Sequence, residues 1–187
     1  VGSEMCIRDS YETAEHEPCV LNTMHLKNPI TADSFKIHAP AGAKKVKALV
    51  MDTLPYMPFT NRRDVELPVV DGVVQCDVEQ DVLYIAQVER HGKNGNVGKA
   101  FMGGFHIRGG AMASSVGHDN HNIIVMGDSF EDMALAVNRC VELGGGQVIV
   151  RSGKVAAEVA YPICGLLSDL PLGELAEKKT ELNRVAH

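Results

Sequence analysis

The chain has 187 residues, of which 45% are hydrophobic, and its formal net charge is −6. This length predicts one domain with a sizeable buried core. The negative charge argues against a nucleic-acid surface, because phosphate binding needs clustered Lys and Arg, and the close basic group Lys44, Lys45 and Lys47 is interpreted as a solvated edge.

The cysteines and the hydropathy pattern predict a cytoplasmic protein. The five cysteines are odd in number, have no CxxC spacing and therefore suit reduced thiols. No apolar run approaches the ~18 residues that would cross a bilayer, and no signal peptide is evident, so no membrane partner is expected.

The beginning of the chain carries little pattern. Residues 1–10 (VGSEMCIRDS) are interpreted as a non-native linker or read-through sequence, which leaves residues 11–187 as the domain. Val20–Leu26 is expected to be a first short strand and Thr31–Phe35 a short helical turn or loop. Pro55 and Pro58 predict a loop over 54–61.

Alternating and β-branched runs predict a series of strands with hairpin turns. Asp71-Gly72 suits a tight turn between two of them, and Pro68 places its strand at a sheet edge. Gly92, Gly95 and Gly98 punctuate a loop without the GK[ST] of a phosphate-binding loop. The expected strands are Val46–Met51, Val65–Val70, Val73–Gln75, Val82–Val88, Ala100–Ile107, Ala111–Val116, Asn122–Met126, Gln147–Val150 and Val155–Val159.

Two helices are predicted. The first is capped at Ser129, has Met133, Val137 and Cys140 on one apolar face and stops at the glycines 144–146. The second covers 172–185, with a cap at Asp169 and a start at Pro171. The pattern favours an α+β fold in which two main helices cover one face of a mostly antiparallel β-sheet with hairpins.

The run HDNHN, residues 118–122, is the densest polar cluster in the sequence. Two histidines three apart could be metal ligands, but a catalytic zinc site needs a third ligand. A polar turn that satisfies local backbone groups explains the same residue types. Spacing alone leaves both interpretations open and favours the turn.

Several separated motifs resemble the C-terminal domain of adenine deaminases, of the amidohydrolase superfamily. They are NTMHL (22–26), VERHGKNGNVG (88–98), GGFHIRGGAMASSVGHDNHNIIVMGDSFEDMALAVNRCVELGGGQVIV (103–150) and PICGLLSD (162–169). The resemblance implies hydrolysis of adenine to hypoxanthine and ammonia, with manganese or iron bound by a catalytic (β/α)₈ barrel. Such a barrel takes ~250 residues, so it is absent from this chain and becomes the expected partner domain.

The resemblance assigns no catalytic residue and no metal ligand to this chain, which it also implies to be cut short at its C-terminus. Because HDNHN holds more polar groups than a turn requires, six residues are expected to line a pocket at the barrel mouth: His118, Asp119, His121, Asn122, Arg90 and His91. A homo-oligomer is left open. The alternative function is a free-standing, non-catalytic binding or assembly module of the same fold.

Overall fold

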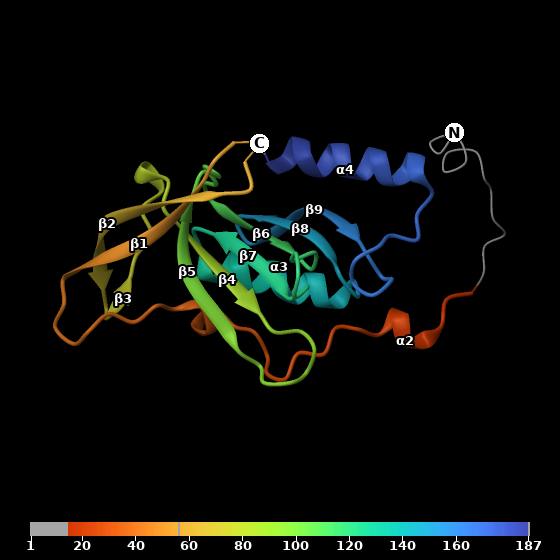
Figure 1. Ribbon diagram of the computed structural model, residues 1–187, viewed down its shortest axis with the longest axis horizontal. Helices are drawn as coiled ribbons and strands as arrows, with labels where there is room; N and C mark the ends of the chain where they lie inside the picture. The colour runs from red at the N-terminus through yellow and green to blue at the C-terminus, as the bar shows by residue number, and fades with distance from the viewer. Residues whose placement is uncertain (1–14, 56, 187) are drawn as a thin grey trace.

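The computed structural model describes residues 15–55 and 57–186 (Figure 1), so the interpretation of residues 1–10 lies outside the described part. The helices in that part are α2 (Pro18–Leu21), α3 (Phe130–Glu142) and α4 (Leu172–Ala186), with the 3₁₀ turns η1 (Ala32–Phe35) and η2 (Val78–Gln80). The strands are β1 (Lys45–Thr53), β2 (Thr60–Val70), β3 (Val73–Val74), β4 (Leu83–Val88), β5 (Val97–Gly103), β6 (Gly110–Ser114), β7 (Ile123–Gly127), β8 (Gly146–Arg151) and β9 (Lys154–Ala160).

These strands form one nine-stranded sheet in the described part of the chain, with the order β3-β2-β1-β5-β4-β7-β6-β8-β9. All neighbours pair antiparallel except β1 and β5, which are parallel over three residue pairs. The predicted α+β class and the mostly antiparallel sheet are therefore confirmed.

The helix α3 forms as its sequence predicts. The Ser129 hydroxyl oxygen accepts a hydrogen bond from the backbone N–H of Asp132 at 3.3 Å, which satisfies one free donor of the first turn. Met133, Val137 and Cys140 are fully buried against the sheet. The helix is thus held by its apolar face and by its cap.

The two main helices lie on opposite faces of the sheet, which corrects the expectation of a single covered face (Figure 1). Val148 and Val150 on β8 belong to the core beneath α3. Ile149, between them, packs with Val159 and with Leu182 of α4. Successive strand residues point to opposite faces, so β8 is the layer between the two helices.

Three further expectations are wrong in detail. In place of a strand over 20–26 the structure has the single turn α2, and His25 alone forms a bridge, to His91. β5 ends at Gly103, because the positive φ of 99° at Gly104 turns the chain out of the sheet. Within the described residues Asp169 caps nothing, and α4 begins directly after Pro171.

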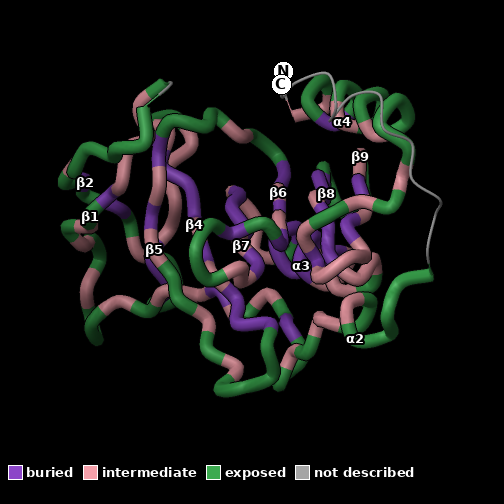
Figure 2. The backbone as a smooth tube through the Cα atoms, turned by 45° about the vertical axis from the view of Figure 1, so that its right-hand side comes forward, coloured by how far each residue is buried: buried purple, intermediate pink, exposed green. Residues whose placement is uncertain are grey.

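The middle of the sheet is its most buried part (Figure 2). β2 is bordered by β3 only at Val69 and Val70, so most of its outer side is an edge, which agrees with the position of Pro68. Four cysteines are described, and all are free thiols. Burial raises the pKa of Cys140 to about 11, so this thiol stays protonated at neutral pH.

Candidate functional site

Arg90 is the centre of a buried polar cluster at one end of the sheet, just beyond β4. Its side chain is only 2% exposed. The guanidinium donates to the carbonyl oxygens of Thr23 at 3.1 Å and Cys164 at 3.0 Å, and to that of His121. Burial lowers the pKa of Arg90. The side chain therefore clamps three segments that are distant in sequence.

Neighbouring residues complete this clamp. The backbone N–H of His25 donates to the Arg90 carbonyl at 2.8 Å, and His25 bridges to His91. The Asn120 carbonyl lies 3.1 Å from Nε2 of His91, while its side-chain oxygen accepts from Gln87 at 3.0 Å. We call residues 22–26, 88–91, 118–122 and 162–165 the Arg90 cluster. It brings together the separated motifs that the sequence singles out.

Glu89 fixes the glycine-rich loop that follows. One of its carboxylate oxygens accepts hydrogen bonds from the backbone N–H groups of Lys93 at 3.0 Å, Asn94 at 3.2 Å and Gly95 at 3.1 Å. The other accepts from His91 at 2.5 Å. Burial raises the pKa of Glu89, but the four donors outweigh it and the net pKa is lowered. The loop is thus wrapped around a carboxylate and offers no free phosphate cradle.

The HDNHN turn presents its first two side chains to solvent. His118 Nδ1 lies 2.9 Å from the Asp119 carboxylate, and both side chains are highly exposed. Asp119 and His121 adopt positive φ values of 71° and 50°, which side-chain-bearing residues rarely occupy. His121 Nδ1 is the one buried side-chain nitrogen or oxygen in the described chain without a hydrogen-bond partner. The turn thus combines two residues of positive φ with a buried, unpaired ring nitrogen. The Arg90 guanidinium anchors it through the His121 carbonyl oxygen.

The structure places the six predicted pocket residues in one region but gives them different environments. The Arg90 side chain is buried, and its guanidinium donates hydrogen bonds to three carbonyl oxygens. The Asn122 side-chain oxygen accepts from the Arg90 backbone N–H at 3.4 Å. His91 and the pair His118 and Asp119 remain exposed. Among the six, the exposed side chains of His91, His118 and Asp119 are left for contacts outside the domain, whereas Nδ1 of His121 is buried.

The cluster does not fit a resident metal ion. Over residues 15–55 and 57–186, no group of three or more His, Cys, Asp and Glu side chains converges as ligands would. His118 is paired with Asp119 at the exposed surface, whereas Nδ1 of His121 is buried. A tight site would need at least three converging donors.

A second ordered loop lies at the opposite end of the sheet, and sequence analysis did not single it out as a site. Residues 104–109 join β5 to β6. The Asp81 carboxylate accepts from the backbone N–H groups of Gly104 at 2.5 Å and His106 at 2.8 Å. The Asp128 carboxylate accepts from Gly109 at 2.6 Å and Gly110 at 2.9 Å. The signal available was Asp128, placed directly after a buried strand that ends in Gly127.

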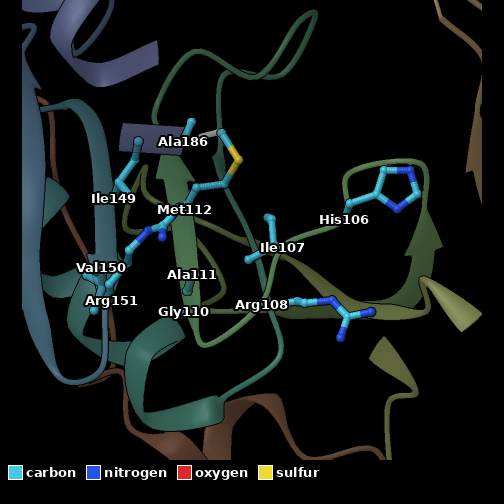
Figure 3. A pocket seen from close by; sticks show the side chains of 10 residues that line it. All are labelled: His106, Ile107, Arg108, Gly110, Ala111, Met112, Ile149, Val150, Arg151 and Ala186. Carbon is cyan, nitrogen blue, oxygen red and sulfur yellow. The ribbon is translucent and has the colours of Figure 1, made fainter. Parts of the chain in front are cut away.

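This loop borders a hollow of about 220 Å³ (Figure 3). The loop residues Ile107 and Arg108 lie on one side of it and Ile149 and Arg151 of β8 on the other, with Met112 between them. Its cationic groups already have partners: Arg108 forms a two-pronged ion pair with Glu79, and Arg151 donates to the Val185 carbonyl at 2.8 Å. Both arginines that line the hollow therefore already have hydrogen-bond partners, and neither is free to bind an anionic ligand.

None of the described helices has the length and apolar character that crossing a membrane requires.

Comparison with known proteins identifies relatives of this chain. A family model described as "Adenine deaminase C-terminal domain" matches residues 58–187. A protein named adenine deaminase from Clostridium botulinum (strain ATCC 19397 / Type A) is 48% identical over 163 residues, which are 87% of this chain and 27% of the relative. An adenine deaminase of Moorella thermoacetica is 44% identical over 165 residues, 88% of this chain and 28% of the relative. The adenine deaminase 1 of Carboxydothermus hydrogenoformans is 46% identical over 158 residues, which are 84% of this chain and 26% of the relative. The chain thus spans little more than a quarter of the length of these relatives.

Proposed function

The chain belongs to the adenine deaminase C-terminal domain family, and from this membership we propose that it works as the C-terminal part of an adenine deaminase. The reaction is the hydrolysis of adenine to hypoxanthine and ammonia. One observation carries the proposal: the alignments with three proteins named adenine deaminase cover between 84% and 88% of this chain. The free thiols of the described cysteines agree with a cytoplasmic location.

The chemistry of this reaction is assigned to the partner domain, an amidohydrolase barrel of the same polypeptide. There, manganese or iron would lower the pKa of a bound water and so supply hydroxide at neutral pH. The residues described here do not provide a ligand set for that ion. Their contribution is to build and stiffen a surface next to the substrate.

We place the HDNHN turn at the wall of the adenine pocket. Its support is physical. Two residues with positive φ in five positions are costly, and strain of this kind concentrates at functional sites. The buried strand β7 and the Arg90 clamp fix the turn, so His118 and Asp119 project from a rigid base, as recognition groups require. His91 is linked to the same turn, because its Nε2 lies 3.1 Å from the carbonyl oxygen of Asn120.

A chimera tests the proposal. The segment of the Moorella thermoacetica relative that aligns with this chain is replaced by the chain itself. Purified protein, loaded with manganese or iron, is then assayed for ammonia release and for conversion of adenine to hypoxanthine. We expect turnover comparable to that of the parent relative, because an equivalent domain should rebuild the same surface.

Two controls decide the outcome. A deletion of the aligned segment measures how far the rest of the enzyme acts alone, and the 187-residue chain with the same metals should release no ammonia above a heat-killed sample. A folded chimera without activity, beside an active parent, would refute the proposal. That result would favour the free-standing binding or assembly module.

A further inference from the structure

One face of the central sheet is apolar and uncovered. Along β4 the residues Tyr84 and Ala86 are 4% and 2% exposed because they face α3, whereas Ile85 between them is half-buried. On β7 the residues Ile123 and Val125 have no exposed surface, and Ile124 again is half-buried. Alternation along both strands therefore places the exposed apolar residues on the face opposite α3.

The registers of the neighbouring strands extend this face. Ile85 pairs with Ala100 of β5, and Met102 of β5 pairs with Met51 of β1. Met51, Ile85, Ala100 and Ile124 line one shallow hollow of about 290 Å³. Leu49, two residues before Met51 on the same face, is 48% exposed. We call these six residues, Leu49, Met51, Ile85, Ala100, Met102 and Ile124, the open face.

Neither α3 nor α4 covers the open face, although Leu83 and Met126 on the same side of the sheet are buried. α4 lies on the same side of the sheet, but it packs on β8 and β9 through Leu182, Ile149 and Val159. η1 packs on the other side, where Phe35 joins the core beneath α3. Strands in the middle of a nine-stranded sheet thus leave branched apolar side chains in contact with water, which marks an interaction surface.

We propose that the open face is the surface on which the amino-terminal part of the full-length enzyme packs, and this inference rests on the proposed function. The matched family is a C-terminal domain, and the chain accounts for only 26% to 28% of its relatives, so the larger part of those polypeptides precedes it. A domain joined by the same chain has an effective concentration in the millimolar range, far above that of a second copy. Interfaces between domains of one chain bury ~600 to 1,500 Å², and the open face extends over the four strands β1, β5, β4 and β7.

The methionines of the chain provide the test, because oxidation of the thioether by hydrogen peroxide follows its exposure. Met51 and Met102 report on the open face. Met57, on the β1–β2 connection and 54% exposed, is the reactive reference, and Met133, fully buried under α3, is the protected one. Oxidation rates are read by peptide mass spectrometry in the 187-residue chain and in the chimera.

We expect Met51 and Met102 to react several-fold more slowly in the chimera than in the chain alone, relative to Met57, while Met133 stays protected in both. Equal rates in both proteins would overturn the proposal. Protection that appears in the chain alone and grows with its concentration would also overturn it, since a second copy would then cover the face. Activity is measured separately: an active chimera with unprotected methionines rejects the surface and retains the function, and an inactive chimera with protection does the reverse.

A pair of variants locates the contact. Ile124→Lys in the chimera should restore the oxidation of Met51 and Met102 to the rate of the isolated chain. Val155→Lys is the matched control, because Val155 is another β-branched residue, 37% exposed, on the edge strand β9. It should leave the protection intact. If neither variant, or both equally, changes the rates of Met51 and Met102, the open face is not the contact.

Discussion

The guanidinium of Arg90 donates a hydrogen bond to the carbonyl oxygen of Cys164 at 3.0 Å, although 74 residues separate the two in the chain. The same group reaches back 67 residues to Thr23 and forward 31 residues to His121. Hydrogen bonds from a charged donor contribute more than neutral ones, roughly 1.5 to 3 kcal/mol each. One side chain therefore joins the beginning, middle and end of the domain.

We expect Arg90→Lys to lower the free energy of unfolding by about 2 to 4 kcal/mol, because an ammonium group cannot reach all three carbonyl oxygens and leaves some of them buried without a donor. Urea unfolding followed by circular dichroism measures the change. Arg62→Lys, on an exposed site of β2, is the control and should stay within about 0.5 kcal/mol. Equal losses in both variants would show that Arg90 is no clamp.

Glu158 on β9 accepts two hydrogen bonds of 2.7 Å from Arg139 of α3. This contact lowers the pKa of Glu158 below its ordinary 4.5, against the opposing effect of burial. A carboxyl group whose pKa is lowered in the folded protein stabilises the fold at pH values above the ordinary pKa of the group. This stabilisation is lost as the pH falls through the lowered pKa. Because both side chains are about one-third exposed, solvent screening keeps the contribution of this pair to stability small.

We therefore expect Glu158→Gln to reduce the free energy of unfolding at pH 7 and to change it less at pH 3, because the stabilisation by the charged carboxylate is lost as the pH falls through its lowered pKa. Urea unfolding at the two pH values measures the difference. Glu142→Gln removes the more exposed partner of Arg139 and should have little effect at either pH. A loss for Glu158→Gln that is equal at pH 3 and pH 7 would contradict the assignment.

Gly110 on β6 is a site of close backbone approach. A Cβ atom there would lie 2.2 Å from the carbonyl oxygen of Val150 on β8. We expect Gly110→Ala to cost about 2 to 4 kcal/mol of unfolding free energy, since a paired backbone cannot move aside cheaply. Gly173→Ala in α4 has open space and should gain up to about 1 kcal/mol. Thermal unfolding of both variants gives the comparison, and a neutral Gly110→Ala would show that the two strands can separate.

The exposed pair His118 and Asp119 can be changed without disturbing the fold. In the active chimera, we expect His118→Ala and Asp119→Asn each to lower turnover about tenfold or more while leaving the melting temperature and the metal content unchanged. Asn tolerates the positive φ at position 119. Unchanged kinetics with a lower melting temperature would instead assign the pair to structure.

Local elements of this fold could be predicted from the sequence because their causes are local. The cap at Ser129, the buried stripe Met133, Val137 and Cys140, and the hairpin turn at Asp71 and Gly72 all depend on residues a few positions apart. The polar residue types of HDNHN also predicted a turn, and the structure adds that two of its residues have positive φ. Such features need no knowledge of the rest of the chain.

Long-range features could not be predicted in the same way. Arg90 follows the predicted strand Val82–Val88, and no local signal indicated that carbonyl groups from three distant segments would enclose its guanidinium. The segment 20–26 has strand-like residues, but within the described part of the chain its strand pairing is limited to the single bridge between His25 and His91. Asp81 and Asp128 acquire their roles only when β4, β5 and β7 bring them beside the loop they hold.

The pairing between β1 and β5 is the shortest link between the two halves of the sheet, and we expect the halves to unfold as separate cooperative units. β1 and β2 share nine residue pairs, but β1 meets β5 at only three, from Val50 to Asp52. Sheet segments joined by so few hydrogen bonds can open as separate units before the whole protein unfolds. We expect native-state hydrogen exchange to show the β1–β2–β3 ribbon exchanging by a lower-energy opening than β4 and β7. One continuous sheet would then contain two units of unfolding, and damage to the ribbon would spare the half that carries the Arg90 cluster.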